Sequence, residues 1–393
     1  MNKNLRILMV APQPFFSARG TPFSVLHRIR ALLERGHSVD LVTYGYGEDI
    51  ALEGLTTYRC SKLPFIDKVK IGPSIPKIFL DVLLYFKTRK LLKTNSYDVF
   101  HSHEEAAFFA LSFGKKLNMP HLYDMHSSLP QQLSNFKAYN IGFIRKIFET
   151  LENKVLSSCD AVITICDDLG RIVDTGYPDK PHSMIENIGE DRKVFQANGV
   201  DWKTKLGIEN QSVLLYTGTF EAYQGIDLFL EAMPAVIKTQ PNTMALLVGG
   251  RDDQVQEYRM MSEQLGILDN VIFTGTVHPE NIPNLIDLST IIVSPRSRGT
   301  NTPLKIYNYL RTSKPLLATD RLTHTQILNP DIAHLVQADS ASFADGIIKL
   351  LEDSAYATQV AERARIFAQE HFSDDSYLEM VNDIYEKMFA DIG

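Results

Sequence analysis

The stretch LRILMVAPQPFFSARGTPFSVLHRIRALLERGHSVDLVTY, residues 5–44, decides the fold. Residues 5–11 are a short, continuous apolar run, which is typical of a strand buried on both faces of a parallel sheet. After a loop, Thr21 as N-cap and Pro22 as first helical residue predict a helix, which Gly36 ends. Residues 39–44 form the next predicted strand, so the order is strand, helix, strand, a βαβ unit.

The same alternation recurs in two sets along the chain. The first set has further predicted strands at VFHSH, HLYDMH, AVITIC and HSMIEN, and the second has strands at 213–219, 244–250, 271–277, 291–296 and 315–320. Helical patterns occur at 226–239, 254–266, 281–288 and 303–312, and in the tail 342–392, with a break at 371–374. The pattern predicts an α/β protein with two parallel sheets, a linker at 188–202, and a ligand cleft at the carboxyl ends of the strands.

Composition excludes several classes of protein. The chain has 393 residues, enough for two domains, and its 44% hydrophobic and 22% charged residues are typical of a soluble globular protein. The net charge of −7 argues against a nucleic-acid coat. Three cysteines without metal-ligand spacing exclude a disulfide scaffold and indicate a reducing compartment. Because no apolar run approaches roughly 18 residues and the start lacks signal-peptide features, we expect a cytoplasmic protein.

Two loops have the composition of anion sites. ARGTP, residues 18–22, places Gly20 and Thr21 at the start of a predicted helix, whose N–H groups attract anions. SPRSRGTNTPLK, residues 294–305, follows a predicted strand and brings Arg296, Arg298 and Lys305 to the edge where such sheets bind ligands. The alternative in each case is an ordinary capped or solvated loop without a ligand.

Histidines gather at the ends of two consecutive predicted strands. HSHEE suggests a metal, but strand alternation puts His101 and His103 on one face and no second ligand cluster is visible, so we expect no metal. His126 ends HLYDMH, where its side chain is expected to emerge into the cleft. The alternative is a structural histidine that bonds a loop carbonyl.

Residues 62–93 hold eight basic residues and two acids, a net +6 in a chain of −7. Five apolar residues share one side of the helix predicted there: Ile78, Phe79, Val82, Leu83 and Phe86. A basic amphipathic helix predicts peripheral contact with an anionic membrane. The alternative is a helix whose apolar stripe faces the core and whose basic face is solvated.

Taken in order, these motifs resemble the retaining glycosyltransferases of family 4. ILMVAPQPFF and RGTPFSVLHRIRALLERGHSVDLVT are similar to the family's first strand, glycine-rich loop and helix, and YDVFHSHEEAAFFA is similar to its "DVVHAH" strand. CDAVITICDDLGRIV and HSMIENIGEDRKVF resemble the stretch leading into the second domain, which LLYTGTFEAYQGIDLFLEAM opens. The resemblance runs nearly end to end.

This resemblance implies the GT-B fold, two facing Rossmann-like domains. Residues 1–188, joined by a C-terminal crossover helix at 374–393, would bind the acceptor, and residues 189–373 the nucleotide-sugar. The implied reaction transfers a sugar with retention, from a UDP-sugar as the commonest donor to a glycan or lipid-linked acceptor, without metal or cofactor. The implied site has Gly20 and Thr21 under the donor phosphates, Arg296, Arg298, Thr300 and Lys305 on the diphosphate, Asn308 near the ribose, Gly249 in the nucleotide pocket, and His126 beside the transferred sugar.

The chain departs from the family at four polar positions. Thr219 and Gln224 stand where the family has an Arg and a Lys, and Thr300 and Asn308 stand where it has the E-x7-E pair. We expect Arg296, Arg298 and Lys305 to supply the missing positive charge. Two other functions share this fold: a non-catalytic subunit that binds a glycan or partner, and a nucleotide-sugar 2-epimerase, which the altered carboxylates disfavour.

Overall fold

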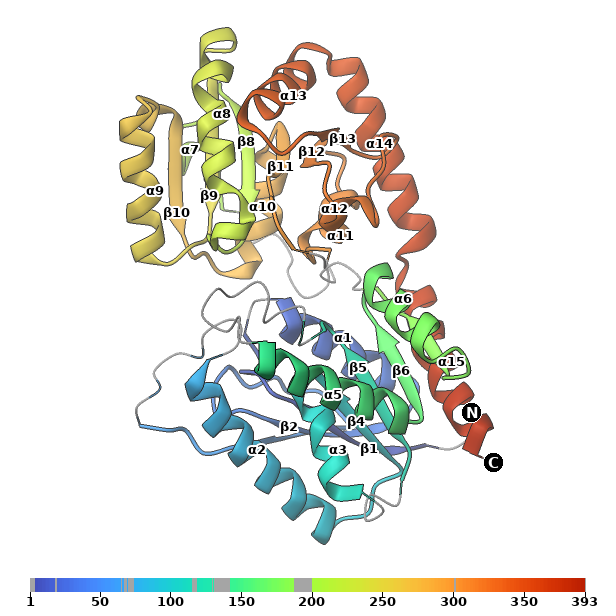
Figure 1. The fold of residues 1–393 in the computed structure, drawn as a ribbon. Coiled ribbons are helices and arrows are strands. Elements are labelled where there is room, and N and C mark those ends of the chain that lie inside the picture. Colours follow the sequence, from blue (N-terminus) through green and yellow to red (C-terminus); the bar gives the residue numbers. More distant parts are fainter. Residues whose placement is uncertain are drawn as a thin grey trace. The chain divides into compact units, whose positions relative to one another are not determined.

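The computed structural model describes residues 4–17, 20–64, 66, 69, 74–114, 119–128, 130, 142–186, 200–299 and 302–392. Its contacts divide the chain into two compact units, Met1–Asn187 with Asp374–Gly393, and Ile188–Ser373. The predicted domain boundary after residue 188 falls in 187–199, outside the described residues, so it stays a prediction. Each unit contains one parallel sheet (Figure 1). This agrees with the predicted α/β class.

The sheet of the first unit has the order β3-β2-β1-β4-β5-β6-β7 among the described residues. Its strands are β1 (Arg6–Ala11), β2 (Ser38–Thr43), β3 (Leu55–Arg59), β4 (Val99–His103), β5 (His121–Met125), β6 (Ala161–Thr164) and β7 (His182–Met184). All neighbouring pairs are parallel, so their carboxyl ends meet at one edge. The predicted strands are confirmed, and β3 is an addition. This edge strand, LTTYR, is polar and partly buried, and it lacks the apolar run that marks the central strands.

Helices cover both faces of this sheet. They are α1 (Gly20–Glu34), α2 (Ile75–Thr94), η1 (Glu104–Ala106), α3 (Ala107–Phe113), α5 (Gly142–Ser158), α6 (Asp167–Gly176) and α15 (Asp374–Ile392). Figure 1 shows α2, α3 and α5 over one face. On that side Tyr123 and Met125 of β5 pack in one core with Val155 of α5. Helix α15, from the far end of the chain, packs against α1, β6 and β7.

The start of α1 differs from the prediction. The helix begins at Gly20, so Thr21 is not its N-cap and Pro22 is not its first residue. Both lie inside the first turn, where a proline is tolerated because its missing N–H would have no helical partner.

The second unit has a sheet of order β10-β9-β8-β11-β12-β13, again with parallel pairs. Its elements are α7 (Trp202–Leu206), β8 (Ser212–Thr217), η4 (Ala222–Gln224), α8 (Ile226–Thr239), β9 (Thr243–Val248), α9 (Asp252–Gln264), η5 (Leu268–Asn270), β10 (Val271–Gly275), η6 (Pro279–Asn281), α10 (Ile282–Leu288), β11 (Ile291–Ser294), α11 (Lys305–Leu310), β12 (Leu316–Thr319), α12 (Leu322–Thr325), β13 (His334–Val336), α13 (Ser340–Glu352) and α14 (Ser354–His371). The predicted strands are confirmed, and β13, a three-residue edge strand, is an addition.

Two helix boundaries in the second unit differ from the prediction. Helix α11 starts at Lys305, not Pro303, and is only six residues long. The helical tail has the predicted break after His371 and a further one at Asp353, whose carboxylate accepts a hydrogen bond from the Tyr356 N–H and so caps α14. Among the described residues, no helix has the length and apolar character that crossing a membrane requires.

Candidate active site

Polar side chains from β4 and β5 form a cluster in the first unit, on the face opposite α3 and α5. In the parallel register His103 lies opposite Asp124. Residues two apart on a strand share a face, so His101 points the same way as His103, and the two rings stack with centroids 4.7 Å apart. His126, directly after β5, lies with Nε2 2.9 Å from His103 Nδ1 and 3.3 Å from Asp124 Oδ1. The cluster ends at the carboxyl edge of the sheet.

Arg28 of α1 pairs with Asp124 in the middle of this cluster. Its Nε donates to Asp124 Oδ2 at 2.9 Å, and both side chains are fully buried. The other two guanidinium nitrogens donate to the Ile185 carbonyl, at 3.0 Å, and to the Tyr377 hydroxyl of α15. A buried charge is tolerated when it is paired and hydrogen-bonded, and here each of the three guanidinium nitrogens donates one hydrogen bond. Neither Arg28 nor Tyr377 was predicted to lie in this cluster. The position of Arg28 within the apolar stripe of its predicted helix could have indicated that its side chain is buried.

Charge in the cluster is confined to this pair at neutral pH. Burial alone would raise the pKa of Asp124, but Arg28 and the nearby histidines outweigh it and hold that pKa well below its usual range. Burial lowers the pKa of His126 to about 4, despite the opposing effect of Asp124, and it also lowers the pKa of His101 and of His103. The carboxylate is therefore ionised and the imidazoles are neutral, so they act as hydrogen-bonding groups.

His126 is less open than the sequence analysis expected. Its side chain is 4% exposed and does not emerge from the sheet edge, because His103 and Asp124 hold Nε2 inward. Even so, His126 is the most exposed of the side chains joined to Asp124, which makes it the member that a ligand reaches first. Its catalytic role stays a prediction.

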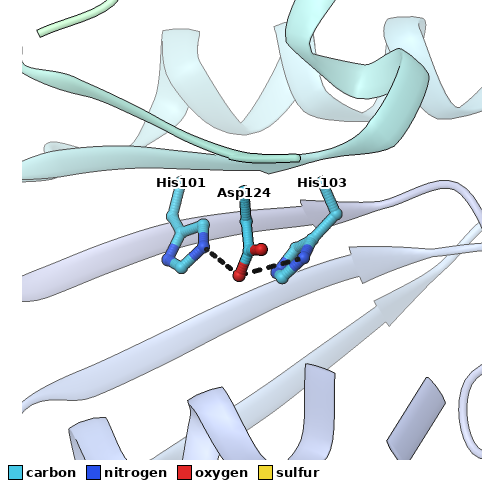
Figure 2. Close-up of side chains that lie close together, drawn as sticks. All are labelled: His101, His103 and Asp124. Carbon is cyan, nitrogen blue, oxygen red and sulfur yellow. Dashed lines mark ion pairs between the residues drawn. The ribbon is translucent and has the colours of Figure 1, made fainter. Parts of the chain in front are cut away.

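The histidine cluster has the residue types of a metal site but not its charge balance. One ligand atom each from His101, His103 and Asp124 lies within 4.8 Å of the others, and Figure 2 shows the two rings on either side of the carboxylate. However, the Asp124 oxygen facing both rings is the one that accepts the Arg28 hydrogen bond. A divalent ion there would add charge next to a buried guanidinium whose charge the carboxylate already balances. The arrangement is better suited to holding His126 in place through His103 and Asp124 than to binding a metal ion.

In the second unit, tight glycine turns bring the ends of β8 and β9 together. Gly249 has φ +120, and a Cβ there would lie 2.0 Å from the carbonyl oxygen of Gly218. Gly225 has φ +73, and a Cβ there would lie 2.1 Å from the Pro295 carbonyl oxygen. Only glycine allows both approaches. The loops after β8, β9 and β11 are thereby packed at the carboxyl edge of this sheet.

Two cations from the β11–α11 region reach the loop after β8. Lys305 Nζ donates to the Thr217 carbonyl at 3.0 Å and lies 3.8 Å from the centre of the Tyr216 ring. The Arg296 guanidinium lies 5.1 Å from the centre of the Tyr223 ring, and its Nε donates to the Arg298 carbonyl. Burial, and then the charge of Arg296, hold the pKa of Lys305 well below its ordinary value. Neither cation takes part in an ion pair with a carboxylate in the described parts of the chain.

These cations lie near the loop in which the resemblance predicts two other cations. Thr219 and Gln224 lie in the loop after β8, next to Tyr223, over which Arg296 packs. The expected substitution of charge is therefore sterically possible from Arg296 and Lys305. The side chain of Arg298 is exposed, and only its carbonyl joins the group.

The remaining predicted residues fall in different places. Asn308 is partly buried, one turn after Lys305 on the same side of α11. Gly20 and Thr21 lie in the first turn of α1, and Thr300 lies outside the described residues. The argument from a helix start near residue 303 is weakened, because α11 begins later and its flanking residue, Leu304, has no capping side chain.

Comparison with known proteins supports one family for both units. Residues 18–188 match the family model described as Glycosyltransferase Family 4, and residues 200–367 match Glycosyl transferases group 1. The putative glycosyltransferase YtcC of Bacillus subtilis is 25% identical over 370 residues, which cover 86% of this chain and 87% of that protein. Phosphatidyl-myo-inositol mannosyltransferase of Mycobacterium leprae is 21% identical over 376 residues, 92% of each chain.

Solved structures share the fold. Sucrose-phosphate synthase from Thermosynechococcus elongatus has a TM-score of 0.78 at 19% identity, covering 99% of this chain and 100% of that one. HepE of Anabaena, solved in complex with UDP, has a TM-score of 0.72 at 16% identity, covering 97% and 100%. The chain belongs to the family 4 glycosyltransferases and has the GT-B fold.

The Arg28–Asp124 pair yields a first prediction. Asp124→Asn leaves a buried guanidinium without its counter-charge, so we expect the free energy of unfolding in urea to fall by about 3–5 kcal/mol. Adding Arg28→Met to Asp124→Asn should recover part of that loss, because the unpaired charge is gone. The exposed pair Arg363–Asp331 provides the control, and Asp331→Asn should cost less than about 1 kcal/mol. An Asp124→Asn variant as stable as the wild type would contradict the pairing.

The buried histidines yield a second prediction, a loss of stability in mild acid. An unfolded histidine has a pKa of about 6.5, whereas burial lowers the pKa of His121 to about 3 and that of His126 to about 4. As the pH falls below about 6.5, the unfolded chain takes up protons that the folded chain does not, so the free energy of unfolding falls until the folded pKa values are reached.

Urea unfolding between pH 7 and pH 5 measures this slope. His126→Gln should reduce it by up to about 1.4 kcal/mol per pH unit, one proton's worth. His278→Gln, at a side chain 60% exposed, is the control and should leave the slope unchanged. A wild-type profile without any decline would show that these imidazoles are not held neutral.

Proposed function

We propose that this glycosyltransferase transfers a sugar from a nucleoside diphosphate sugar, with UDP as the nucleotide, to a hydroxyl of a glycan or lipid-linked acceptor, with retention at the anomeric carbon. The observation that carries the proposal is the group of Arg296 and Lys305 at the carboxyl edge of the second sheet. Both are partly buried, and neither has a carboxylate counter-ion among the described residues. Two cations held close together without an anion are suited to a diphosphate.

The roles of the other residues follow from this assignment. Arg298, exposed beside Arg296, and Thr300 would contact the outer phosphate oxygens. Asn308, one turn from Lys305, would accept hydrogen bonds from the ribose in place of the usual glutamate, and Gly249 lets the chain pass close to the nucleotide. For Gly20 and Thr21, in the first turn of α1, a role at the donor phosphates stays a prediction.

In the reaction, the bond between the anomeric carbon and the diphosphate oxygen breaks, and the acceptor oxygen bonds to the same face of that carbon. Negative charge grows on the departing diphosphate, and preorganised cations stabilise that charge most strongly in a site with little water. The acceptor proton passes to the leaving phosphate oxygen, so no carboxylate nucleophile is required. His126, neutral and braced by Asp124 and His103, would hold the transferred sugar and the acceptor hydroxyl by hydrogen bonds.

Similar proteins support the substrate classes without deciding them. Structures of HepE hold UDP and UDP-glucose, which favours a UDP-sugar as donor. The mycobacterial relatives are named for mannosyl transfer to phosphatidyl-myo-inositol, which favours an acceptor that carries lipid.

The depressed pKa of Lys305 gives the proposal a specific test. A bound diphosphate would favour the ammonium form and raise this pKa, so UDP binding should take up protons at mildly alkaline pH. Calorimetric titration with UDP in buffers of different ionisation enthalpy measures the uptake. Lys305→Met should abolish the uptake and weaken binding by about 1.5–3 kcal/mol, the range for a hydrogen bond to a charged group.

Lys238→Met, at an exposed lysine in the last turn of α8, is the matched control and should bind UDP as the wild type does. If Lys305→Met binds UDP with wild-type affinity and proton uptake, the cation pair is not the diphosphate site. If no nucleotide binds the wild type at millimolar concentration, the non-catalytic alternative replaces the proposal.

A further inference from the structure

Helix α2 has apolar side chains on two opposite sides. Leu80, Leu84 and Leu91 are buried in the core of the first unit. Four large apolar residues on the other side of the helix face outward, and they form what we call the outer stripe: Ile78, Phe79, Val82 and Phe86, which are 61%, 52%, 48% and 57% exposed. Spacings of four residues place this stripe on one side of the helix. Of the five residues in the predicted stripe, these four are exposed, whereas Leu83 is partly buried and packs against the core.

Buried polar contacts fix this orientation of α2. Lys77 Nζ lies 3.2 Å from Glu105 Oε1 of η1, with both side chains mostly buried, and the Tyr44 hydroxyl donates to Asp81. Turning the outer stripe into the core would break both contacts and expose Leu80 and Leu84. The helix thus has charged residues on its inner side and large apolar residues outside, and the exposure of the stripe is specified by the fold.

The outer side of α2 changes from apolar to basic along its axis. Beyond Phe86, the exposed side chains are Arg89, Lys90 and Lys93, and the single acid of the helix, Asp81, faces inward. Helix α3 packs between α2 and α5 (Figure 1), with Phe109 and Phe113 of α3 against Tyr85 of α2. On α5, Ile147 is 43% exposed and lies next to the exposed Lys146.

We propose that the outer side of α2, together with Ile147 and Lys146 of α5, docks on an anionic lipid bilayer. The outer stripe would enter the boundary between headgroups and acyl chains, and Arg89, Lys90 and Lys93 would lie among the lipid phosphates. Charge favours this occupant over a second copy of the chain, because the same face of another copy brings no exposed acid of α2 to these cations. That the bilayer also carries the acceptor rests on the proposed function, whereas the docking itself does not.

Sedimentation of the whole protein with vesicles tests the docking, without any nucleotide-sugar present. We expect binding to vesicles of phosphatidylglycerol and phosphatidylcholine in equal amounts, weak binding to pure phosphatidylcholine, and a loss of binding as salt is added. Replacing Arg89, Lys90 and Lys93 by Gln should lower the partition coefficient on the order of 100-fold, at roughly fivefold for each charge near the surface.

A second variant isolates the apolar contribution. Ile78→Ser with Phe86→Ser should lower the partition coefficient by roughly tenfold or more, because two large side chains no longer leave water. Met260→Ser with Ile366→Ser, at positions 49% and 43% exposed in the second unit, is the matched control and should bind as the wild type does. All variants change exposed residues, and an unchanged melting temperature confirms their fold.

Two results would overturn the proposal. One is equal absence of binding to both kinds of vesicle. The other is a wild-type protein that forms dimers in solution and becomes monomeric in the Ile78→Ser, Phe86→Ser variant, which would assign the outer stripe to a second copy. Because UDP titration is done without lipid, failure of docking leaves the proposed donor site untouched, and failure of UDP binding leaves the docking result valid.

Discussion

The buried ion pair of Arg28 and Asp124 constrains the first unit more than any other contact. A guanidinium without access to water must have its donors satisfied, and here they are taken by β5, by the Ile185 carbonyl after β7, and by Tyr377 of α15. One side chain of α1 therefore holds segments that are far apart in the sequence. Burial lowers the pKa of His101, His103 and His126 although the charged Asp124 opposes this, so the three imidazoles beside the pair are neutral hydrogen-bonding groups.

In the second unit, the main feature of the candidate site is the position of two cations, Arg296 and Lys305. The resemblance predicts two cations in the loop after β8, at positions where this chain has the uncharged Thr219 and Gln224. Arg296 and Lys305 come to the same loop from the next strand in the sheet, supported by the rings of Tyr223 and Tyr216. Such a relocation keeps the charge near the strand ends while changing the residues that provide it.

The sequence predicted the parts of this protein that depend on local pattern. Buried parallel strands are apolar runs, so β1, β2, β8 and β9 were identified, whereas the short edge strands β3 and β13 have no such run. Helix starts were less accurate, because α1 begins at Gly20, before the predicted N-cap Thr21, and α11 begins at Lys305 after Leu304, which has no capping side chain. In the site, alternation put His101 and His103 on one face, but the pairing of Asp124 with Arg28, and of Arg28 with Tyr377, was missed because these residues are distant in sequence. The sequence pattern also could not decide whether Ile78 and Phe86 are exposed, because the helix has apolar residues on two sides and either side could face the core.

The central claim, that this chain is a sugar transferase using the cation pair of its second unit, is tested most directly by donor turnover. The measurement is release of nucleoside diphosphate from UDP-, GDP- and ADP-sugars, with a mixture of glycan and lipid-linked acceptors. We expect turnover of a UDP-sugar by the wild type, its loss in Lys305→Met, and a strong reduction in His126→Gln at an unchanged melting temperature. Turnover in Lys305→Met equal to that of the wild type, or no turnover of any donor, would contradict the account.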